Sequence, residues 1–243
     1  MAHLRHTLRL SLVGLVVSLA LLTSCGRGEQ VPRLPNHDAF FAALSSDDHI
    51  EAFGLMEEGI EGMEAVRMTY TVESSGAFTA FLTGVLDLRT DADTLLTAQG
   101  SFGGEVMDLV LAIRGDSLIA RSGDRQKSVE RPEDVREALV IGLTRMGIFH
   151  NLARLSAAQP PDHGEGGVRE WVEVVDVRAP SGNMEGEESG SSSFRFGIRV
   201  SGQDSGEAVL IVNRETGLPR MRIQEVRFPG GMMTVRAEYA WRR

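Results

Sequence analysis

Three aspartates of this chain are close enough in sequence to suggest a cation site. Asp87, Asp91 and Asp93 recur at short intervals, as oxygen ligands do in calcium loops. An EF-hand loop, however, needs further oxygen ligands and a glycine at the positions where this chain has Leu95 and Leu96. The spacing therefore predicts solvated turn residues and no calcium site.

A serine in the middle of the chain is the best candidate for a nucleophile. Gly115-Asp-Ser-Leu118 spells the signature of a family of serine esterases, in which a histidine three residues after an aspartate completes the triad. Here Ser117 lies mid-chain, the last histidine is His163, and no Asp-x-x-His sequence follows. A serine needs a base that takes its proton. We therefore predict no catalytic residue and no enzyme activity, and we interpret Gly-Asp-Ser as a hairpin turn.

The remaining metal-binding and phosphate-binding signals are also weak. The histidines at positions 37, 49, 150 and 163 show no metal-ligand spacing, and Cys25 is the single cysteine. The glycines of Gly100-Ser-Phe-Gly-Gly104 lack the lysine and the strand-to-helix setting of a phosphate-binding loop. No metal and no cofactor are expected.

The charge of the chain excludes one class of partner. Among 243 residues, 34 are acidic and 25 are Lys or Arg, which gives a formal net charge of −9. Nucleic-acid binding depends on basic contacts to phosphate, so no nucleic-acid partner is expected. Hydrophobic content of 42% and charged content of 24% are ordinary for a globular domain.

The N-terminus predicts export and a membrane anchor. Arg5 and Arg9 precede an apolar run, Leu10 to Leu22, which fits a secretory signal and is too short to span a bilayer. Because the run ends in Leu-Thr-Ser-Cys25, it resembles the bacterial lipoprotein signal, which implies a lipidated, palmitate-type anchor on Cys25. An ordinary cleaved signal with a chance cysteine is the alternative. Gly26 stands where an acidic residue would often retain a lipoprotein in the inner membrane, so the resemblance implies the outer membrane, facing the periplasm.

Periodicity predicts a mainly β domain that carries helices. We expect a signal peptide over 1–24, a lipidated tether over 25–37 and one domain over 38–243. Helical segments follow residue 36, with Ile50, Phe53, Leu55 and Met56 on an apolar side. Alternation of period two then predicts about five antiparallel strands between Val66 and Arg121.

A second helix and a second group of strands complete the expected domain. Pro132-Glu-Asp opens a helix with a wide apolar stripe that ends before Pro160. Five further strands are expected near residues 171–177, 194–200, 208–213, 221–228 and 232–241. Between the first two of these strands, residues 180–193 are rich in Gly, Ser and Glu and predict a disordered loop.

The C-terminal segments resemble a family of bacterial envelope proteins. Val209-Leu-Ile-Val-Asn-Arg-Glu-Thr-Gly-Leu-Pro-Arg220, followed by Gly230-Gly-Met-Met-Thr-Val-Arg-Ala-Glu-Tyr239, gives strand, turn, strand, Gly-Gly turn and strand. With the order of elements from Ala39 to Trp241, this resembles the proteins related to LolA, LolB, RseB and LppX/LprG. The resemblance implies an α+β fold: a curved antiparallel sheet that forms an incomplete barrel, with helices plugging its concave face.

Several strands are apolar on both faces, which bears on the interior. Phe78, Leu82 and Leu86 oppose Phe81 and Val85, and the segment 106–113 is similarly two-sided. Either both faces are covered, or one face lines a lipid-sized cavity. For such a cavity we predict the lining Tyr70, Phe78, Leu82, Leu109, Leu111, Ile141, Met146, Phe149, Phe196 and Ile198. A register error of one residue would exchange the strand members for their neighbours.

The sequence leads to two functions of different kinds. The first is a membrane-anchored periplasmic lipoprotein that binds lipids, or the acyl chains of other lipoproteins, in an apolar cavity. The second is a non-enzymatic protein-interaction or envelope-stress-sensing module of the same fold, with a filled core. The predicted partners are the membrane, through Cys25, and lipids or other lipoproteins.

Overall fold

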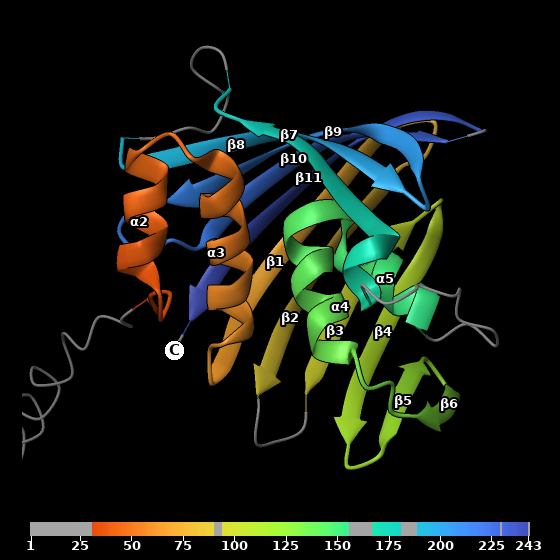
Figure 1. Ribbon diagram of the computed structural model, residues 1–243. Coiled ribbons are helices and arrows are strands. Elements are labelled where there is room, and N and C mark those ends of the chain that lie inside the picture. Colours follow the sequence, from red (N-terminus) through yellow and green to blue (C-terminus); the bar gives the residue numbers. More distant parts are fainter. Residues whose placement is uncertain (1–30, 90–93, 156–166, 181–188, 229, 243) are drawn as a thin grey trace, which may run out of the picture. The chain divides into compact units, whose positions relative to one another are not determined.

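Strands dominate the computed structural model, which describes residues 31–89, 94–155, 167–180, 189–228 and 230–242 (Figure 1). All of them belong to one unit, Val31–Arg243. Within it the chain order is α2 (His37–Ser45), α3 (His49–Glu61), β1 (Ala65–Gly76), β2 (Ala80–Arg89), β3 (Leu95–Phe102), β4 (Glu105–Arg114), β5 (Ser117–Ser122), β6 (Arg125–Glu130), α4 (Val135–Ile141), a π-helix (Gly142–Met146), α5 (Ile148–Leu155), a 3-10 helix (Gly167–Trp171), β7 (Val172–Arg178), β8 (Ser191–Val200), β9 (Gln203–Asn213), β10 (Pro219–Phe228) and β11 (Gly231–Arg242).

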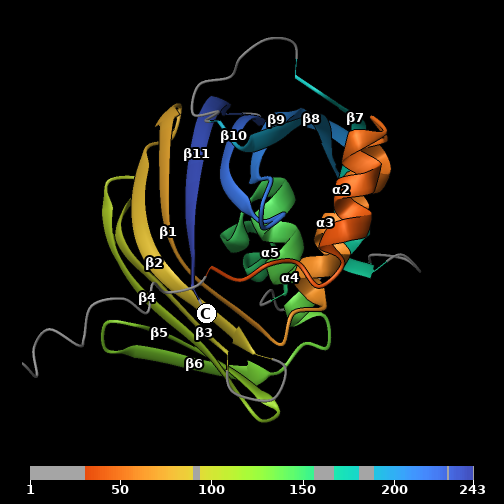
Figure 2. The ribbon, with the colours of Figure 1, turned by 90° about the vertical axis from the view of Figure 1, so that its left-hand side faces the viewer.

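The described strands form one antiparallel sheet that does not close into a barrel. Their spatial order is β6-β5-β4-β3-β2-β1-β11-β10-β9-β8-β7. The two meanders β1–β6 and β7–β11 are therefore joined by the pairing of β1 with β11, in which Tyr70 lies opposite Tyr239. Figure 2 shows the sheet bent around α4 and α5, while α2 and α3 lie near β7 and β8. The predicted α+β architecture, an incomplete barrel plugged by helices, is confirmed.

Alternation explains which face of the sheet turns inward. Along β1, Val66, Met68 and Tyr70 are buried, and the residues between them are half-buried. Strand β6 was not predicted, because its sequence Arg-Gln-Lys-Ser-Val-Glu is polar and almost wholly exposed at the edge of the sheet. Polar side chains on an edge strand discourage pairing with other chains, so an edge strand need not show the alternation that marks a half-buried one. The second group of five predicted strands corresponds to β7–β11.

The predicted continuous helix after Pro132 is broken. Helix α4 passes into a π-helical turn, and Gly147, with φ of 140°, separates that turn from α5. A side chain on Gly142 would come within 2.8 Å of the Cα of Ile148, so glycine is required where the two segments meet. Sequence periodicity could not reveal this break because apolar residues continue across it.

A buried ion pair fixes the π-helix against α3. The carboxylate of Glu57 accepts hydrogen bonds from Arg145 Nε at 2.8 Å and Nη2 at 2.6 Å, and from Thr144 Oγ1 at 2.6 Å. Arg145 Nη1 donates to the carbonyl oxygen of Val172 at 2.7 Å, and Arg169 reaches both Glu57 and Glu61. Glu57 is 1% exposed. One carboxylate thus links α3 to the π-helix, and its arginine partner links that helix to β7.

The N-terminal border of the packed domain precedes residue 38. Leu34 is 3% exposed, belongs to the core, and donates its N–H to the carbonyl oxygen of Thr216. The last residues of the predicted tether are therefore part of the domain. Ile50 is 69% exposed and does not share the buried side of α3 with Phe53 and Met56. The predicted signal segment and Cys25 lie outside the described residues.

Candidate functional site

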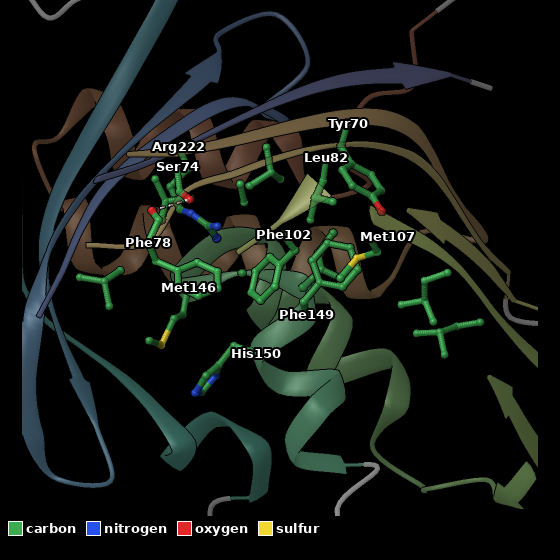
Figure 3. Close-up of a pocket in the computed structure, with 18 of the residues that line it drawn as sticks. Tyr70, Ser74, Phe78, Leu82, Phe102, Met107, Met146, Phe149, His150 and Arg222 are labelled. Atoms are coloured by element: carbon green, nitrogen blue, oxygen red, sulfur yellow. Dashed lines mark hydrogen bonds between the residues drawn. The ribbon is translucent and has the colours of Figure 1, made fainter. Parts of the chain in front are cut away.

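An apolar cavity of about 780 Å³ lies on the concave side of the sheet. It is bounded by β1–β6, by β10 and β11, and by the junction between the π-helix and α5 (Figure 3). Its lining residues are Tyr70, Val72, Ser74, Phe78, Ala80, Leu82, Phe102, Met107, Leu109, Leu111, Leu118, Ala120, Lys127, Val129, Met146, Gly147, Ile148, Phe149, His150, Arg222, Val226, Met233, Val235 and Tyr239. Most of this surface offers no hydrogen bond to a ligand.

A glycine in the middle of the sheet makes room for the Tyr70 ring, which forms part of the cavity wall. Tyr70 is paired with Gly84, and Gly84 with Ala98. A side chain on Gly84 would collide with the ring of Tyr70, so glycine at this position lets the ring lie across β2. The hydroxyl of Tyr70 donates to the carbonyl oxygen of Thr97 on β3. Burial raises the pKa of Tyr70 well above its ordinary value, which keeps the phenol neutral.

The helical side of the cavity is formed where the chain breaks at Gly147. Met146, Ile148 and Phe149 flank the break and line the cavity. The ring of Phe149 meets that of Tyr70 edge-on, with 6.1 Å between centroids. The helical wall therefore combines the end of a π-helical turn, a glycine with positive φ and the first residues of α5.

Two aromatic residues lie near the turns at one end of the strands. The rings of Phe78 and Phe102 are 4.7 Å apart, and Phe102 is 45% exposed. Ser74 Oγ donates to the carbonyl oxygen of Phe78 at 3.1 Å, which holds the turn between β1 and β2 (Figure 3). This end of the cavity therefore has an aromatic rim that reaches solvent.

The polar exceptions in the wall are few. Lys127 is exposed on the edge strand β6, and His150 is half-buried on α5. Arg222 on β10 is only 2% exposed, and its Nη1 donates to the carbonyl oxygens of Gly142 at 2.8 Å and Leu143 at 2.9 Å. Tyr239 donates to the same Leu143 oxygen at 3.0 Å. Burial raises the pKa of Tyr239, and the nearby Arg222 charge lowers it by less.

Seven of the predicted lining residues border the cavity: Tyr70, Phe78, Leu82, Leu109, Leu111, Met146 and Phe149. Three others do not. Ile141, Phe196 and Ile198 are 0%, 0% and 1% exposed and belong to the filled core. The prediction was wrong for Phe196 and Ile198 because α2 and α3 fill the space over β8, where the ring of Phe53 contacts that of Phe196 at 5.0 Å. It was wrong for Ile141 because the end of α4 packs into the core and not against the cavity.

Several lining residues were not predicted, and the sequence held a signal for only some of them. Phe102 and Met107 continue the inward rows of β3 and β4 and could have been found from the register. Arg222 could not, because Met221 and Ile223 beside it suggest that its own face points to solvent. In fact these two neighbours pack with Val209 and Ile211 in a separate small cluster.

Two-sided apolarity has a simple origin in this sheet. Leu82 on β2 lines the cavity, whereas Phe81 and Val85 on the other face are 49% and 41% exposed. Val106 on β4 is 92% exposed. The inner face borders a cavity, and the outer face carries exposed apolar residues.

The other candidate sites gain no support from the geometry. Ser117 starts β5 directly after a turn at Gly115, φ 54°, and pairs with Arg114 and Glu130. Asp87 pairs with Arg67 at 3.2 Å, while Asp91, Asp93 and His163 lie outside the described residues. In the described part of the chain no three acidic, histidine or cysteine side chains group as metal ligands do. Nor does any helix there have the length and apolarity that a membrane span requires.

Comparison with known proteins gives matches among solved structures only. No family model matches the chain, and no curated protein matches it. MucB shows 13% identity over 79% of this chain, with a TM-score of 0.32, and the match spans 57% of MucB. LprF from Mycobacterium bovis shows 9% identity over 86% of this chain and 94% of its own, with a TM-score of 0.41. A LolA-superfamily protein from Nitrosomonas europaea shows 7% identity over 76% of this chain and 90% of its own, with a TM-score of 0.33. Structures similar to this chain thus include a LolA-superfamily protein, at low identity.

Proposed function

We propose that this protein binds the acyl chain of a lipid, or of a lipidated protein, in the cavity beneath the concave face of the sheet. The observation that carries the proposal is the hollow apolar interior of about 780 Å³. This volume lies within the range of small-molecule sites, roughly 300–1,000 Å³. An apolar ligand is favoured because the wall consists mainly of Leu, Val, Phe and Met side chains.

The energetics of burial support a long aliphatic chain as the ligand. A hexadecanoyl chain has about 14 methylene groups, and at ~0.8 kcal/mol each their burial is worth roughly 11 kcal/mol before the costs of ordering. Met107, Met146 and Met233 line the cavity, and flexible thioethers adapt to chains of different length. Non-covalent, non-catalytic binding is the activity that these groups can perform.

The location of this function belongs to the same proposal. Export and lipidation of Cys25 would tether the domain to the cell envelope, at the outer membrane and facing the periplasm. The support for this is the basic start, the short apolar run and the Leu-Thr-Ser-Cys25 sequence. A tethered domain cannot diffuse between membranes, so it suits an acceptor or a resident lipid-binding protein better than a shuttle.

The test combines a direct search for bound lipid with a variant that fills the cavity. Native mass spectrometry of the full chain carrying Cys25→Ser should reveal co-purifying lipid, and the delipidated protein should take up a fluorescent fatty acid. Ala120→Trp places an indole in the cavity and should weaken uptake at least tenfold. Ala112→Trp is the matched control, because Ala112 neighbours the inward Leu111 and does not line the cavity. Absence of both lipid and uptake would refute the proposal.

One observation favours the second candidate, a protein-interaction or stress-sensing module. Phe81 on β2, Ser101 on β3 and Val106 on β4 are successive partners across the sheet, so the exposed Phe81 and Val106 lie in one row. Exposed apolar residues that gather on one face commonly mark contact surfaces. A stoichiometric protein partner in a pull-down, lost on Phe81→Ser and found without any bound lipid, would favour this function over lipid binding.

A further inference from the structure

Strand β10 presents an unusual pair of polar side chains to the concave face. Val226 and Arg222 both line the cavity, and Gln224 lies between them on the same face of the strand. Arg222 is 2% exposed and Gln224 is 1% exposed. Their partners across the neighbouring strands are apolar: Ala237 and Leu210 for Arg222, and Val235 and Ala208 for Gln224. Two strongly polar groups are therefore buried in an apolar wall.

Only one side of the Arg222 guanidinium is used within the described residues. Both of its hydrogen bonds come from Nη1 and go to the carbonyl oxygens of Gly142 and Leu143. Nε is buried without a partner, and so are both amide atoms of Gln224. Nη2 points toward Gly147, where an added Cβ would lie 3.5 Å away. No carboxylate of the described chain forms an ion pair with Arg222.

Such an arrangement is costly unless a ligand completes it. Buried polar groups in folded proteins nearly always have hydrogen-bond partners, and a buried charge is normally paired. The unused edge, Nε with Nη2, presents two parallel N–H donors, which is the fork that matches the two oxygens of a carboxylate. Gln224, two residues along the same face of β10, has a buried amide nitrogen without a partner and is the nearest such donor along the strand.

We propose that Arg222, assisted by Gln224, binds the carboxylate of a free fatty acid whose chain lies in the apolar cavity. This inference rests on the proposed function and names its ligand class. A single arginine matches a monoanionic head, whereas an ester, an alcohol or a protein-linked acyl amide offers no charge to the fork. The acid would enter head first, so that its chain runs away from Arg222 along the walls formed by β1–β5.

In the opposite orientation of the fatty acid, Lys127 instead of Arg222 would hold the carboxylate. Lys127 also lines the cavity, but it is exposed on the edge strand β6, with six strands between β6 and β10 in the sheet. A carboxylate held by Lys127 would remain in contact with water and would leave the Arg222 edge unpaired. Burial of the unpaired arginine therefore favours the orientation in which the carboxylate lies at Arg222.

Ligand series and variants separate this inference from the proposed function. With the full chain carrying Cys25→Ser, displacement of a fluorescent probe is measured for hexadecanoic acid, hexadecanol and methyl hexadecanoate. Wild type should prefer the acid at least tenfold. Arg222→Met should remove that preference, so that the variant binds the acid no more tightly than it binds the alcohol or the ester, and Arg222→Lys should keep part of the preference. Lys127→Gln should leave the preference unchanged.

The outcomes are distinct. Equal binding of acid, alcohol and ester by wild type overturns the carboxylate site but leaves acyl-chain binding intact, whereas no binding of any of them defeats the proposed function as well. Loss of the acid preference in Lys127→Gln alone means that the head faces outward.

A second measurement uses wild type, because Arg222→Met also removes the two bonds to the helical carbonyls. In crystals soaked with 12-bromododecanoic acid, the anomalous signal of bromine should lie on the side of Leu118 and Val129. Bromine beside Arg222 would overturn the inward head.

Discussion

The two halves of the concave face differ in what covers them. Over β8 and β9, helices α2 and α3 fill the interior with aromatic rings: Phe53 meets Phe194 at 5.7 Å and Phe196 at 5.0 Å between centroids. Over β1–β5 the facing element is the short start of α5, and a cavity of about 780 Å³ remains. One sheet thus supports a filled core and a hollow one side by side.

Sequence differences between the two sets of strands explain the contrast. The filled half has large inward residues, such as Phe194, Phe196 and Ile198, that interlock with the helices. In the hollow half the ring of Tyr70 covers Gly84 on β2, and beyond it the inward residues Leu82, Leu109 and Leu111 border the cavity. The contrast teaches that an inward-facing apolar residue packs into the core where α2 and α3 cover it and borders the cavity where they do not, which is where we propose that a ligand binds.

The largest loss of stability is expected at the border between the two halves, where the ion pair of Glu57 and Arg145 is buried. Glu57→Leu leaves Arg145 buried and without its carboxylate, and loss of one partner of such a pair costs about 3–5 kcal/mol. We expect a loss of this size in the free energy of unfolding, measured by urea denaturation. Glu61→Gln is the control, because Glu61 is partly exposed and its partner Arg169 keeps two other carboxylates. Equal losses for both variants would contradict a central role for Glu57.

A matched pair of truncations tests the filled against the hollow half directly. Ile198→Ala removes packed core atoms and should cost about 2–5 kcal/mol in the free energy of unfolding. Leu109→Ala, at a half-buried position that already borders the cavity, should cost clearly less, because it enlarges an existing space. In the lipid-binding assay the order should reverse, with Leu109→Ala the more damaging. Two equal losses of stability would mean that the half around Leu109 is packed like the rest.

How much of this contrast the sequence could reveal depends on distance along the chain. Alternation identified the strands and the inward side of Tyr70, Leu82 and Leu109, because burial of one face imposes a period of two. It could not distinguish Phe196 and Ile198 from these residues, since whether the interior is filled depends on α2 and α3, which precede β8 by more than a hundred residues.

Local patterns also misled where two faces carry apolar residues. Met221 and Ile223 lie on the outer face of β10, and their apolar character wrongly suggested that Arg222 points to solvent. Arg222 in fact lines the cavity and is the main residue of the proposed carboxylate site. The break at Gly147 was hidden in the same way by the apolar residues on both sides of it.

Two glycine substitutions, one in each half, compare the halves again and should change the free energy of unfolding by smaller amounts. Gly147→Ala forces a side chain onto a backbone with φ of 140°, which costs about 1–3 kcal/mol, and it should disturb the helical wall of the cavity and lipid uptake as well. Gly54→Ala on α3 is the opposite case, because nothing lies within 4 Å and the backbone is helical. It should stabilise the filled half by about 0.4–1 kcal/mol. Thermal and urea unfolding measure both, and a stabilising Gly147→Ala would contradict the role given to the break.

The smallest effect that we expect is a change in the free energy of unfolding at alkaline pH. It involves the only two tyrosines of the chain, Tyr70 in the cavity wall and Tyr239 beside Arg222. Burial raises the pKa of both phenols, so the folded chain keeps them neutral where the unfolded chain ionises them, above pH about 10. Their contribution to stability is therefore complete below that pH and is lost as pH rises toward the folded pKa values. Tyr70→Phe should flatten the alkaline fall in unfolding free energy, and phenolate absorbance should appear only with unfolding. Absorbance at an ordinary pKa in the folded protein would show that water reaches the phenol hydroxyls, which would contradict their burial in the wall.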